Sequence, residues 1–286
     1  MIKVILEQKM IVVSKVNSKP TQDGDGVKIS RIADFTGKYF DPYLMIDELK
    51  SDDKNDFIGG FPAHPHRGIE TFTYMIKGGF EHKDQLGNSA LITAGNVQWM
   101  STGYGVIHSE MPITDENEGM HGFQIWLNMP AKDKLRPARY QDSTSLPNLT
   151  NRTGASLKLM AGHWTFGGET ASSPLTELTA NAALADLTLD SNAKAEFDLS
   201  DAEQVLVYVH SGSFSNPRLN TGELAVVDAQ QALAITASNE GAGALILVGN
   251  KIKEKIVHMG PFVMNSEQEI RQAIEDYQQG KFGSIA

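Results

Sequence analysis

Two short motifs place histidine and carboxylate side chains at a spacing that suits metal binding. His64 and His66 are separated by one residue, and His108 and Glu110 have the same separation further along the chain. On a β-strand, residues i and i+2 point to the same face, so each motif would present two ligands together. If the two strands are neighbours in one barrel, three imidazoles and one carboxylate converge. That donor set suits iron, manganese, nickel, copper or zinc.

Glu70 is a second candidate for the carboxylate. It lies four residues after His66 and shares the face of His64 and His66 if the strand is regular. The spacing from His64 to Glu70 resembles the general ligand motif of the cupins. The residues alone therefore leave two alternatives open. Glu70 is either the carboxylate ligand or a neighbouring group that orients one of the histidines.

The sequence lacks the motifs of several other kinds of catalytic or metal site. The chain has no cysteine, which excludes disulfides, thiolate nucleophiles, iron–sulfur clusters and cysteine-ligated zinc. It contains neither a G-x-S-x-G nucleophile motif nor an H-E-x-x-H zinc motif. The remaining histidines stand without partners at ligand spacing, and we expect them to be structural or exposed. They are His82, His121, His163, His210 and His258.

Short strands between turns are the elements that would position these motifs. Residues 71–76 are β-branched and aromatic and end at Lys77-Gly78-Gly79, and residues 90–93 end at Ala94-Gly95-Asn96. Residues 122–128 show partial alternation of polar and apolar side chains. These patterns predict strands, and many strands at short spacing indicate antiparallel sandwiches or barrels.

The second half of the chain repeats this character. A polar, proline-containing stretch at 142–148 is typical of a linker. Beyond it, five apolar runs predict buried or half-buried strands, at 157–160, 185–189, 205–209, 223–227 and 244–248. We therefore expect two β domains, residues 1–142 and residues 143–286, with the metal motifs in the first.

The C-terminal segment predicts a helix. Ser266 and Glu269 have the spacing of a capping box, and Gly280 stands where a helix-terminating glycine is expected. The apolar positions between them follow helical spacing. They are Ile270, Ala273, Ile274 and Tyr277. We expect this helix to pack on a domain edge.

Composition indicates a globular chain with little affinity for polyanions. The 286 residues are 41% hydrophobic and 21% charged, as is usual for globular proteins. The formal net charge of −10 disfavours direct binding to nucleic acid or to an anionic membrane. The apolar N-terminal stretch is interrupted by charged residues, and no run is long enough to span a membrane. We expect a cytoplasmic protein.

Long segments of the sequence resemble signatures of the pirin family, a branch of the cupin superfamily. One segment carries His64 and His66, a second carries His108 and Glu110, and the resemblance reaches nearly the whole chain. The matching segments are 61–71, 95–101, 105–110, 124–128, 130–134, 139–141, 260–265, Ile270, Asp276, Tyr277 and 280–282.

The resemblance implies an all-β bicupin of two antiparallel β-barrel or jelly-roll domains with a C-terminal α-helix. It also implies a monomer with one divalent metal ion in the N-terminal barrel, and Fe(II) is favoured over manganese, nickel, copper or zinc. Carried over from the family, the metal ligands are His64, His66, His108 and Glu110. That assignment makes Glu110 the carboxylate ligand and leaves Glu70 as a supporting group. The C-terminal barrel, with the lone His210, is expected to be free of metal.

The resemblance offers two functions. In the first, the protein acts like a quercetin 2,3-dioxygenase, which opens a flavonol ring with O2 and releases carbon monoxide. Glu110 would then be the general base for the flavonol hydroxyl, and Phe61, Met75 and Trp126 are candidates to face the substrate. In the second, the protein resembles iron-dependent transcription cofactors, and the redox state of its metal regulates binding to a protein partner.

Overall fold

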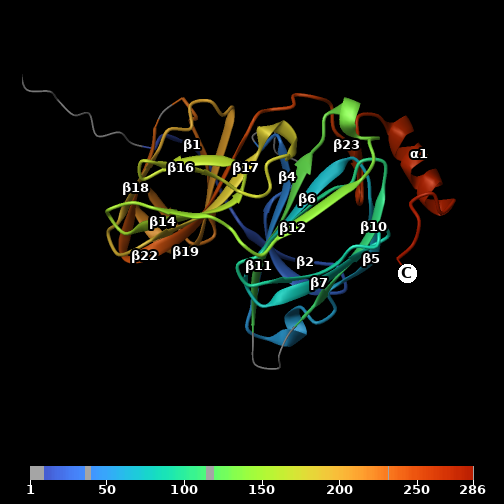
Figure 1. Ribbon diagram of the computed structural model, residues 1–286, viewed down its shortest axis with the longest axis horizontal. Coiled ribbons are helices and arrows are strands. Elements are labelled where there is room, and N and C mark those ends of the chain that lie inside the picture. Colours follow the sequence, from blue (N-terminus) through green and yellow to red (C-terminus); the bar gives the residue numbers. More distant parts are fainter. Residues whose placement is uncertain (1–9, 36–39, 114–118, 231, 286) are drawn as a thin grey trace, which may run out of the picture. The chain divides into compact units, whose positions relative to one another are not determined.

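The computed structural model describes residues 10–35, 40–113, 119–230 and 232–285. This part of the chain is mostly β-structure in antiparallel sheets with an α-helix near its C-terminus, which confirms the predicted all-β class (Figure 1). Within the described residues, no helix has both the length and the apolar character that a membrane span requires.

Two sheets form the unit that contains the histidine motifs. The larger sheet has the strand order β12-β9-β6-β11-β4-β3-β2, and the smaller has the order β5-β10-β7-β8. The strands of the larger sheet are β2 (Lys19–Asp23), β3 (Val27–Ala33), β4 (Tyr43–Ser51), β6 (Ile69–Lys77), β9 (Val97–Ser101), β11 (Met120–Asn128) and β12 (Arg139–Ser143). Those of the smaller sheet are β5 (Phe61–His66), β7 (Gly79–Asp84), β8 (Ser89–Thr93) and β10 (Val106–Pro112).

The C-terminal segment completes this unit. It contributes the hairpin β23 (Val257–Met259) and β24 (Phe262–Met264) and the helix α1 (Glu267–Gln278). Short 3-10 turns also occur in the described chain, η1 (Lys54–Asp56), η2 (Ala131–Asp133) and η3 (Thr179–Asn181). One half of the predicted capping box is formed, because Ser266 Oγ accepts the N–H of Glu269. The Glu269 carboxylate accepts from the Ser266 hydroxyl and from the backbone N–H of Asn265. Gly280 adopts a φ of 72°, as expected just beyond a helix end.

The other unit is built around one large sheet. Its strands follow the order β1-β21-β19-β22-β17-β14-β13, with β18 paired to β22 and β20 paired to β19. The strands are β1 (Val12–Asn17), β13 (Asn148–Thr150), β14 (Ala155–Ala161), β17 (Ala183–Leu189), β18 (Lys194–Phe197), β19 (Gln204–Asn216), β20 (Arg218–Asn220), β21 (Glu223–Val227) and β22 (Leu233–Gly249). A separate hairpin consists of β15 (His163–Phe166) and β16 (Glu169–Ser172). The interior of this unit is filled by one continuous cluster of buried apolar side chains.

Each end of the chain belongs to the compact unit formed mainly by the opposite half of the sequence. β1 pairs with β21, so residues 10–18 group with the C-terminal half of the chain. Residues 252–285, including α1, group with the N-terminal half. The predicted boundary at residue 142 follows the order along the chain, whereas the packing joins segments that are distant in sequence. The predicted helix therefore packs on the unit that carries the histidine motifs.

Candidate metal centre

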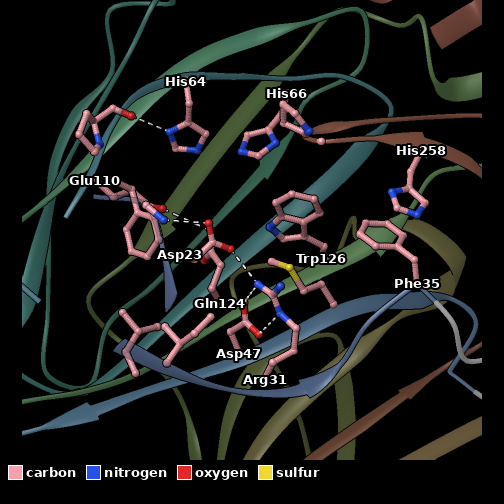
Figure 2. A pocket seen from close by; sticks show the side chains of 18 residues that line it. Asp23, Arg31, Phe35, Asp47, His64, His66, Glu110, Gln124, Trp126 and His258 are labelled. Carbon is pink, nitrogen blue, oxygen red and sulfur yellow. Dashed lines mark hydrogen bonds and ion pairs between the residues drawn. The ribbon is translucent and has the colours of Figure 1, made fainter. Parts of the chain in front are cut away.

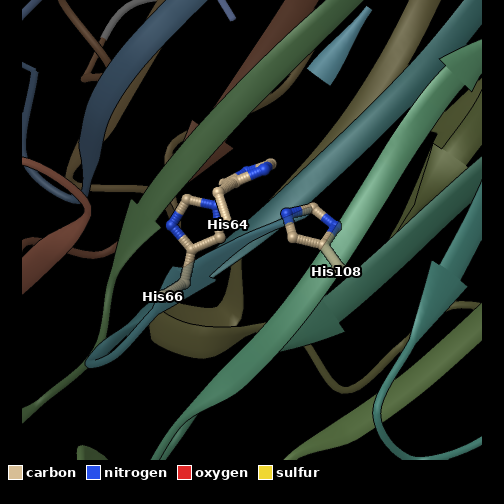
Figure 3. Close-up of side chains that lie close together, drawn as sticks. All are labelled: His64, His66 and His108. Carbon is tan, nitrogen blue, oxygen red and sulfur yellow. The ribbon is translucent and has the colours of Figure 1, made fainter. Parts of the chain in front are cut away.

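Pairing of β5 with β10 brings three of the predicted ligands together. The two strands are antiparallel, and His64 lies directly opposite His108 in their register. The ring centroids of His64 and His66 are 4.8 Å apart, and that of His108 lies 4.4 Å from the first and 5.0 Å from the second (Figure 3). One ligand nitrogen from each ring lies within 4.8 Å of the others. The geometry therefore suits a single ion bound by three imidazoles.

Burial of His66 and His108 favours their neutral, metal-binding form. Burial lowers the pKa of His66 and of His108 well below the usual range, and the neighbouring imidazoles lower it further. The ring nitrogens of these two residues have no hydrogen-bond partner among the described residues. His64 Nδ1 lies 2.8 Å from the carbonyl oxygen of Pro62, which fixes its other nitrogen as the lone-pair donor. Buried, unpartnered imidazole nitrogens are the donors that a divalent transition metal requires.

Glu110 lies on the same strand as His108 but is held by other groups. It is only 3% exposed, and its carboxylate accepts hydrogen bonds from Thr73 Oγ1 at 3.0 Å, from Gln98 Nε2 and from Gln124 Nε2 at 3.3 Å. Within 4.8 Å, its oxygen groups with His108 and with His82 rather than with His64 and His66. The structure thus brings the predicted histidine ligands together and places Glu110 beside them in a hydrogen-bonded network.

Glu70 does not share a strand face with the histidines. Gly68 has a φ of 82°, and this turn separates β5 from β6, which belong to different sheets. The buried Glu70 carboxylate accepts hydrogen bonds from Trp99 Nε1, Arg136 Nη2 and the backbone N–H of Thr179. The condition for Glu70 to share the face of His64 and His66, a regular strand, is therefore not met. The positive φ of Gly68 turns the chain into a second sheet.

A cavity of about 630 Å3 adjoins the imidazoles (Figure 2). His64, His66 and Glu110 line it, and Phe35, Met45, Phe61 and Trp126 contribute its apolar and aromatic walls. This size and lining are typical of a site for a small, largely apolar ligand. Of the side chains considered for substrate contact, Phe61 and Trp126 line the cavity. Met75 instead lies in a buried apolar cluster.

A charged group forms another part of the cavity wall. Arg31 binds both carboxylate oxygens of Asp47, with Nε–Oδ1 at 2.9 Å and Nη2–Oδ2 at 2.7 Å, and its Nη2 also lies 2.7 Å from Asp23. Hydrogen bonding to Asp47 raises the pKa of Arg31, so the guanidinium stays charged. Because its charge is already matched by two carboxylates, this wall offers no unpaired cation to an anionic ligand.

Several residues near the centre were not expected from the sequence. His82 is fully buried beside His108, Gln124 binds Glu110, and His258 lines the cavity and stacks on Phe35 at 4.1 Å. The prediction that His82 has no partner at ligand spacing was wrong, because His82 and Asp84 repeat the i, i+2 spacing of the metal motifs and lie 3.2 Å apart. Away from the cavity, the other histidines bind polar side chains near them, as expected of structural residues. His121 contacts Glu48, His163 contacts Ser172, and His210 contacts Asp186.

The sequence is similar to that of known proteins along most of its length. The family model described as Pirin matches residues 26–127, and the one described as Pirin C-terminal cupin domain matches residues 184–283. A Vibrio cholerae protein named provisionally as a quercetin 2,3-dioxygenase is 45% identical over 271 residues, which are 93% of this chain and 95% of its own.

Solved structures share the fold over most of the chain. A quercetin 2,3-dioxygenase from Acinetobacter baumannii is 28% identical with a TM-score of 0.86, over 97% of this chain and 100% of its own. A bacterial pirin from Escherichia coli, solved in complex with nickel(II), has a TM-score of 0.59 at 20% identity, over 83% of this chain and 99% of its own. The predicted bicupin fold is confirmed by these likenesses.

Proposed function

The chain belongs to the pirin family. From this premise we propose that the unit with the histidine motifs, called the N-terminal unit below, is a metal-dependent dioxygenase that opens flavonol-like rings with O2. The observation that carries the proposal is the set of three converging imidazoles beside a cavity with aromatic walls. Its likeness to the Vibrio cholerae relative and to the Acinetobacter baumannii quercetin 2,3-dioxygenase supports the proposal.

The proposed metal ligands are His64, His66, His108 and Glu110. Fe(II) is the proposed ion, and manganese, nickel, copper and zinc fit the same nitrogen and oxygen donors. The nickel in the Escherichia coli pirin supports a metal in this family's fold. When bound, the ion supplies a Lewis acid and a template on which substrate and O2 can meet.

The protein's own residues prepare the substrate. Glu110 faces the cavity, and its carboxylate is the group placed to accept the proton of a phenolic hydroxyl. Thr73 and Gln98 hold one oxygen of this carboxylate and Gln124 the other, which fixes its orientation. Phe35, Phe61 and Trp126 provide aromatic surface against which a planar ring system can pack while water is excluded.

The test is oxygen uptake and carbon monoxide release by anaerobically Fe(II)-loaded protein when quercetin is added. We expect turnover in the parent, and a loss of about 10²-fold or more in Glu110→Ala, because both a ligand and the base are removed. His163→Ala is the matched control, because His163 is exposed and lies in the other unit. Bound iron without uptake in the parent, or undiminished turnover in Glu110→Ala, would contradict the proposal.

A further inference from the structure

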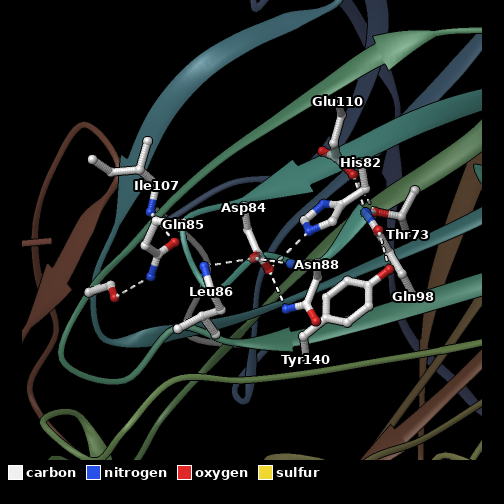
Figure 4. A network of polar contacts seen from close by, with 11 residues as sticks. Thr73, His82, Asp84, Gln85, Leu86, Asn88, Gln98, Ile107, Glu110 and Tyr140 are labelled. Carbon is white, nitrogen blue, oxygen red and sulfur yellow. Dashed lines mark hydrogen bonds and ion pairs between the residues drawn. The ribbon is translucent and has the colours of Figure 1, made fainter. Parts of the chain in front are cut away.

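A second polar pair lies beside the proposed ligands on the neighbouring strand. β7 pairs with β10 so that His82 is opposite Glu110 and Asp84 is opposite His108. His82 is 0% exposed and stacks on the ring of Tyr140 with centroids 4.7 Å apart and planes 17° apart. Figure 4 shows His82 between Asp84 and Glu110. The smaller sheet therefore continues the polar face of the centre across β7.

Asp84 fixes which nitrogen of His82 carries the proton. Asp84 Oδ1 accepts the backbone N–H groups of Leu86 at 2.9 Å and Asn88 at 3.0 Å. Its Oδ2 accepts from Asn88 Nδ2 at 2.8 Å and lies 3.2 Å from His82 Nε2. A carboxylate held by so many donors is an acceptor, so Nε2 of His82 is the N–H. His82 Nδ1 is then a lone-pair acceptor, and it has no hydrogen-bond partner among the described residues.

His108 needs such an acceptor. One of its ring nitrogens points toward His64 and His66, and the other points away from them (Figure 3). In a neutral imidazole that binds a metal through the first nitrogen, the second nitrogen is an N–H donor. The ring is fully buried, and a buried N–H without an acceptor is destabilising.

Few acceptors lie within reach of that N–H in the described structure. One ligand atom each of His82, His108 and Glu110 lies within 4.8 Å of the others. Glu110 Oε1 already accepts from Thr73 and Gln98, and its Oε2 accepts from Gln124 and is the oxygen left for the proposed ion. Asp84 has two donors on each oxygen. The vacant acceptor in this group is therefore His82 Nδ1.

We propose that His82, oriented by Asp84, is a positioning residue for His108. Its Nδ1 accepts the outward N–H of His108, directly or through one water, and so keeps the inward nitrogen free to bind metal. The inference rests on the metal centre proposed above. It adds two residues of β7 to that centre: Asp84 orients His82, and His82 orients His108.

Zinc(II) is the probe, because it is diamagnetic and binds the same donors. Affinity is measured by competition with a chromophoric chelator, and histidine tautomers by long-range 1H–15N NMR on metal-free and zinc-loaded protein. His82→Leu removes the acceptor. Asp84→Asn inverts the tautomer, because the amide oxygen stays on the backbone N–H groups of Leu86 and Asn88 and the amide nitrogen then faces His82. His82→Gln keeps an acceptor. Lys83→Ala is the matched control on the same strand, because the Lys83 side chain is exposed.

We expect His82 to be protonated on Nε2 in the parent, and about 10- to 100-fold weaker zinc binding in His82→Leu and Asp84→Asn. His82→Gln and Lys83→Ala should stay close to the parent. A parent His82 protonated on Nδ1, or variants with unchanged affinity, would overturn the role. If the parent binds a second zinc ion and His82→Leu loses it, His82 is a direct zinc ligand, and the positioning role is overturned.

The two proposals can fail separately. A parent that binds no zinc contradicts the centre itself, whereas a zinc-binding parent with unaffected variants contradicts only the role of His82. If a variant does not fold, as thermal unfolding of the metal-free protein would reveal, the tautomer of the parent decides the question.

Discussion

Lys134 is a buried cation whose hydrogen-bond partners are all uncharged. Its Nζ donates to the carbonyl oxygen of Gly68 at 2.7 Å, to Asn128 Oδ1 at 2.8 Å and to the carbonyl oxygen of Val263 at 2.9 Å. Burial lowers its pKa to about 8. The three bonds clamp the turn after β5 to strand β24, next to the histidine motif.

This residue predicts an unusual pH dependence of stability. The unfolded lysine has a pKa of about 10.4, so above pH 8 the folded state releases a proton that the unfolded state retains. The free energy of unfolding should therefore rise by about 2 kcal/mol from pH 8 to about pH 10 through this group. Urea unfolding of the parent and of Lys134→Met at several pH values measures the difference. Parallel pH profiles for the two proteins would contradict the assignment.

At the scale of residues, the sequence predicted which histidines converge better than it predicted their surroundings. The i, i+2 spacing identified His64, His66 and His108, because a strand's geometry turns that spacing into a shared face. Gln124 could not be found in this way, because it reaches Glu110 from a strand of the other sheet. His82 and Asp84 have the i, i+2 spacing, but no second motif in the sequence pairs with them as the His108 motif pairs with the His64 motif.

At the scale of elements, local patterns predicted the strands and the helix, while their breaks and partners depended on tertiary structure. The strands predicted at 71–76, 90–93 and 122–128 correspond to β6, β8 and β11. The break between β5 and β6 was missed, because a single glycine in a polar stretch is compatible with either a strand or a turn. The partner of α1 was also not predictable, since capping signals describe only the helix itself.

The contact that holds α1 is a buried ion pair with the residue next to His66. Arg67 Nη1 lies 3.0 Å from Asp276 Oδ2, and both side chains are almost fully buried. The guanidinium also donates to the carbonyl oxygen of Tyr104 and lies over the rings of Tyr104 and Phe282, at 4.3 and 4.7 Å. The C-terminal helix is thus attached directly to the strand that carries the histidine motif.

Asp276→Ala should therefore destabilise the protein by about 3 kcal/mol, because it leaves Arg67 buried without its carboxylate. Urea unfolding of the metal-free protein measures the loss. The double variant Arg67→Met with Asp276→Leu should lose less than the sum of the two single variants, since no unpaired charge remains. A loss of about 1 kcal/mol or less in Asp276→Ala, as for a surface ion pair, would be the contrary result.

At the scale of the whole molecule, two β units could be predicted but their membership could not. The change in composition near residue 142 indicated a second series of strands, and the structure contains that series. The exchange of chain ends arises from the pairing of β1 with β21 and from the packing of α1, which join residues far apart in sequence. Such long-range contacts leave no mark in local patterns.

The interiors of the two units predict where metal binds. In the described residues of the C-terminal unit, apolar side chains fill the interior, and its buried histidine, His210, pairs with Asp186 at 2.9 Å. The groups of histidine and carboxylate atoms close enough to hold an ion, among the residues described, lie in the N-terminal unit. We therefore expect one equivalent of zinc per chain after dialysis, and none in His64→Ala/His66→Ala, measured by elemental analysis.

The same measurement on His210→Ala gives the matched control, because this change removes a buried histidine from the other unit and should leave one equivalent bound. Zinc should also raise the unfolding temperature of the parent and of His210→Ala, but not that of the double variant, because only a folded state that binds the ion gains stability from it. Zinc retained by the double variant, or a second equivalent lost in His210→Ala, would show that metal binding is not confined to the N-terminal unit.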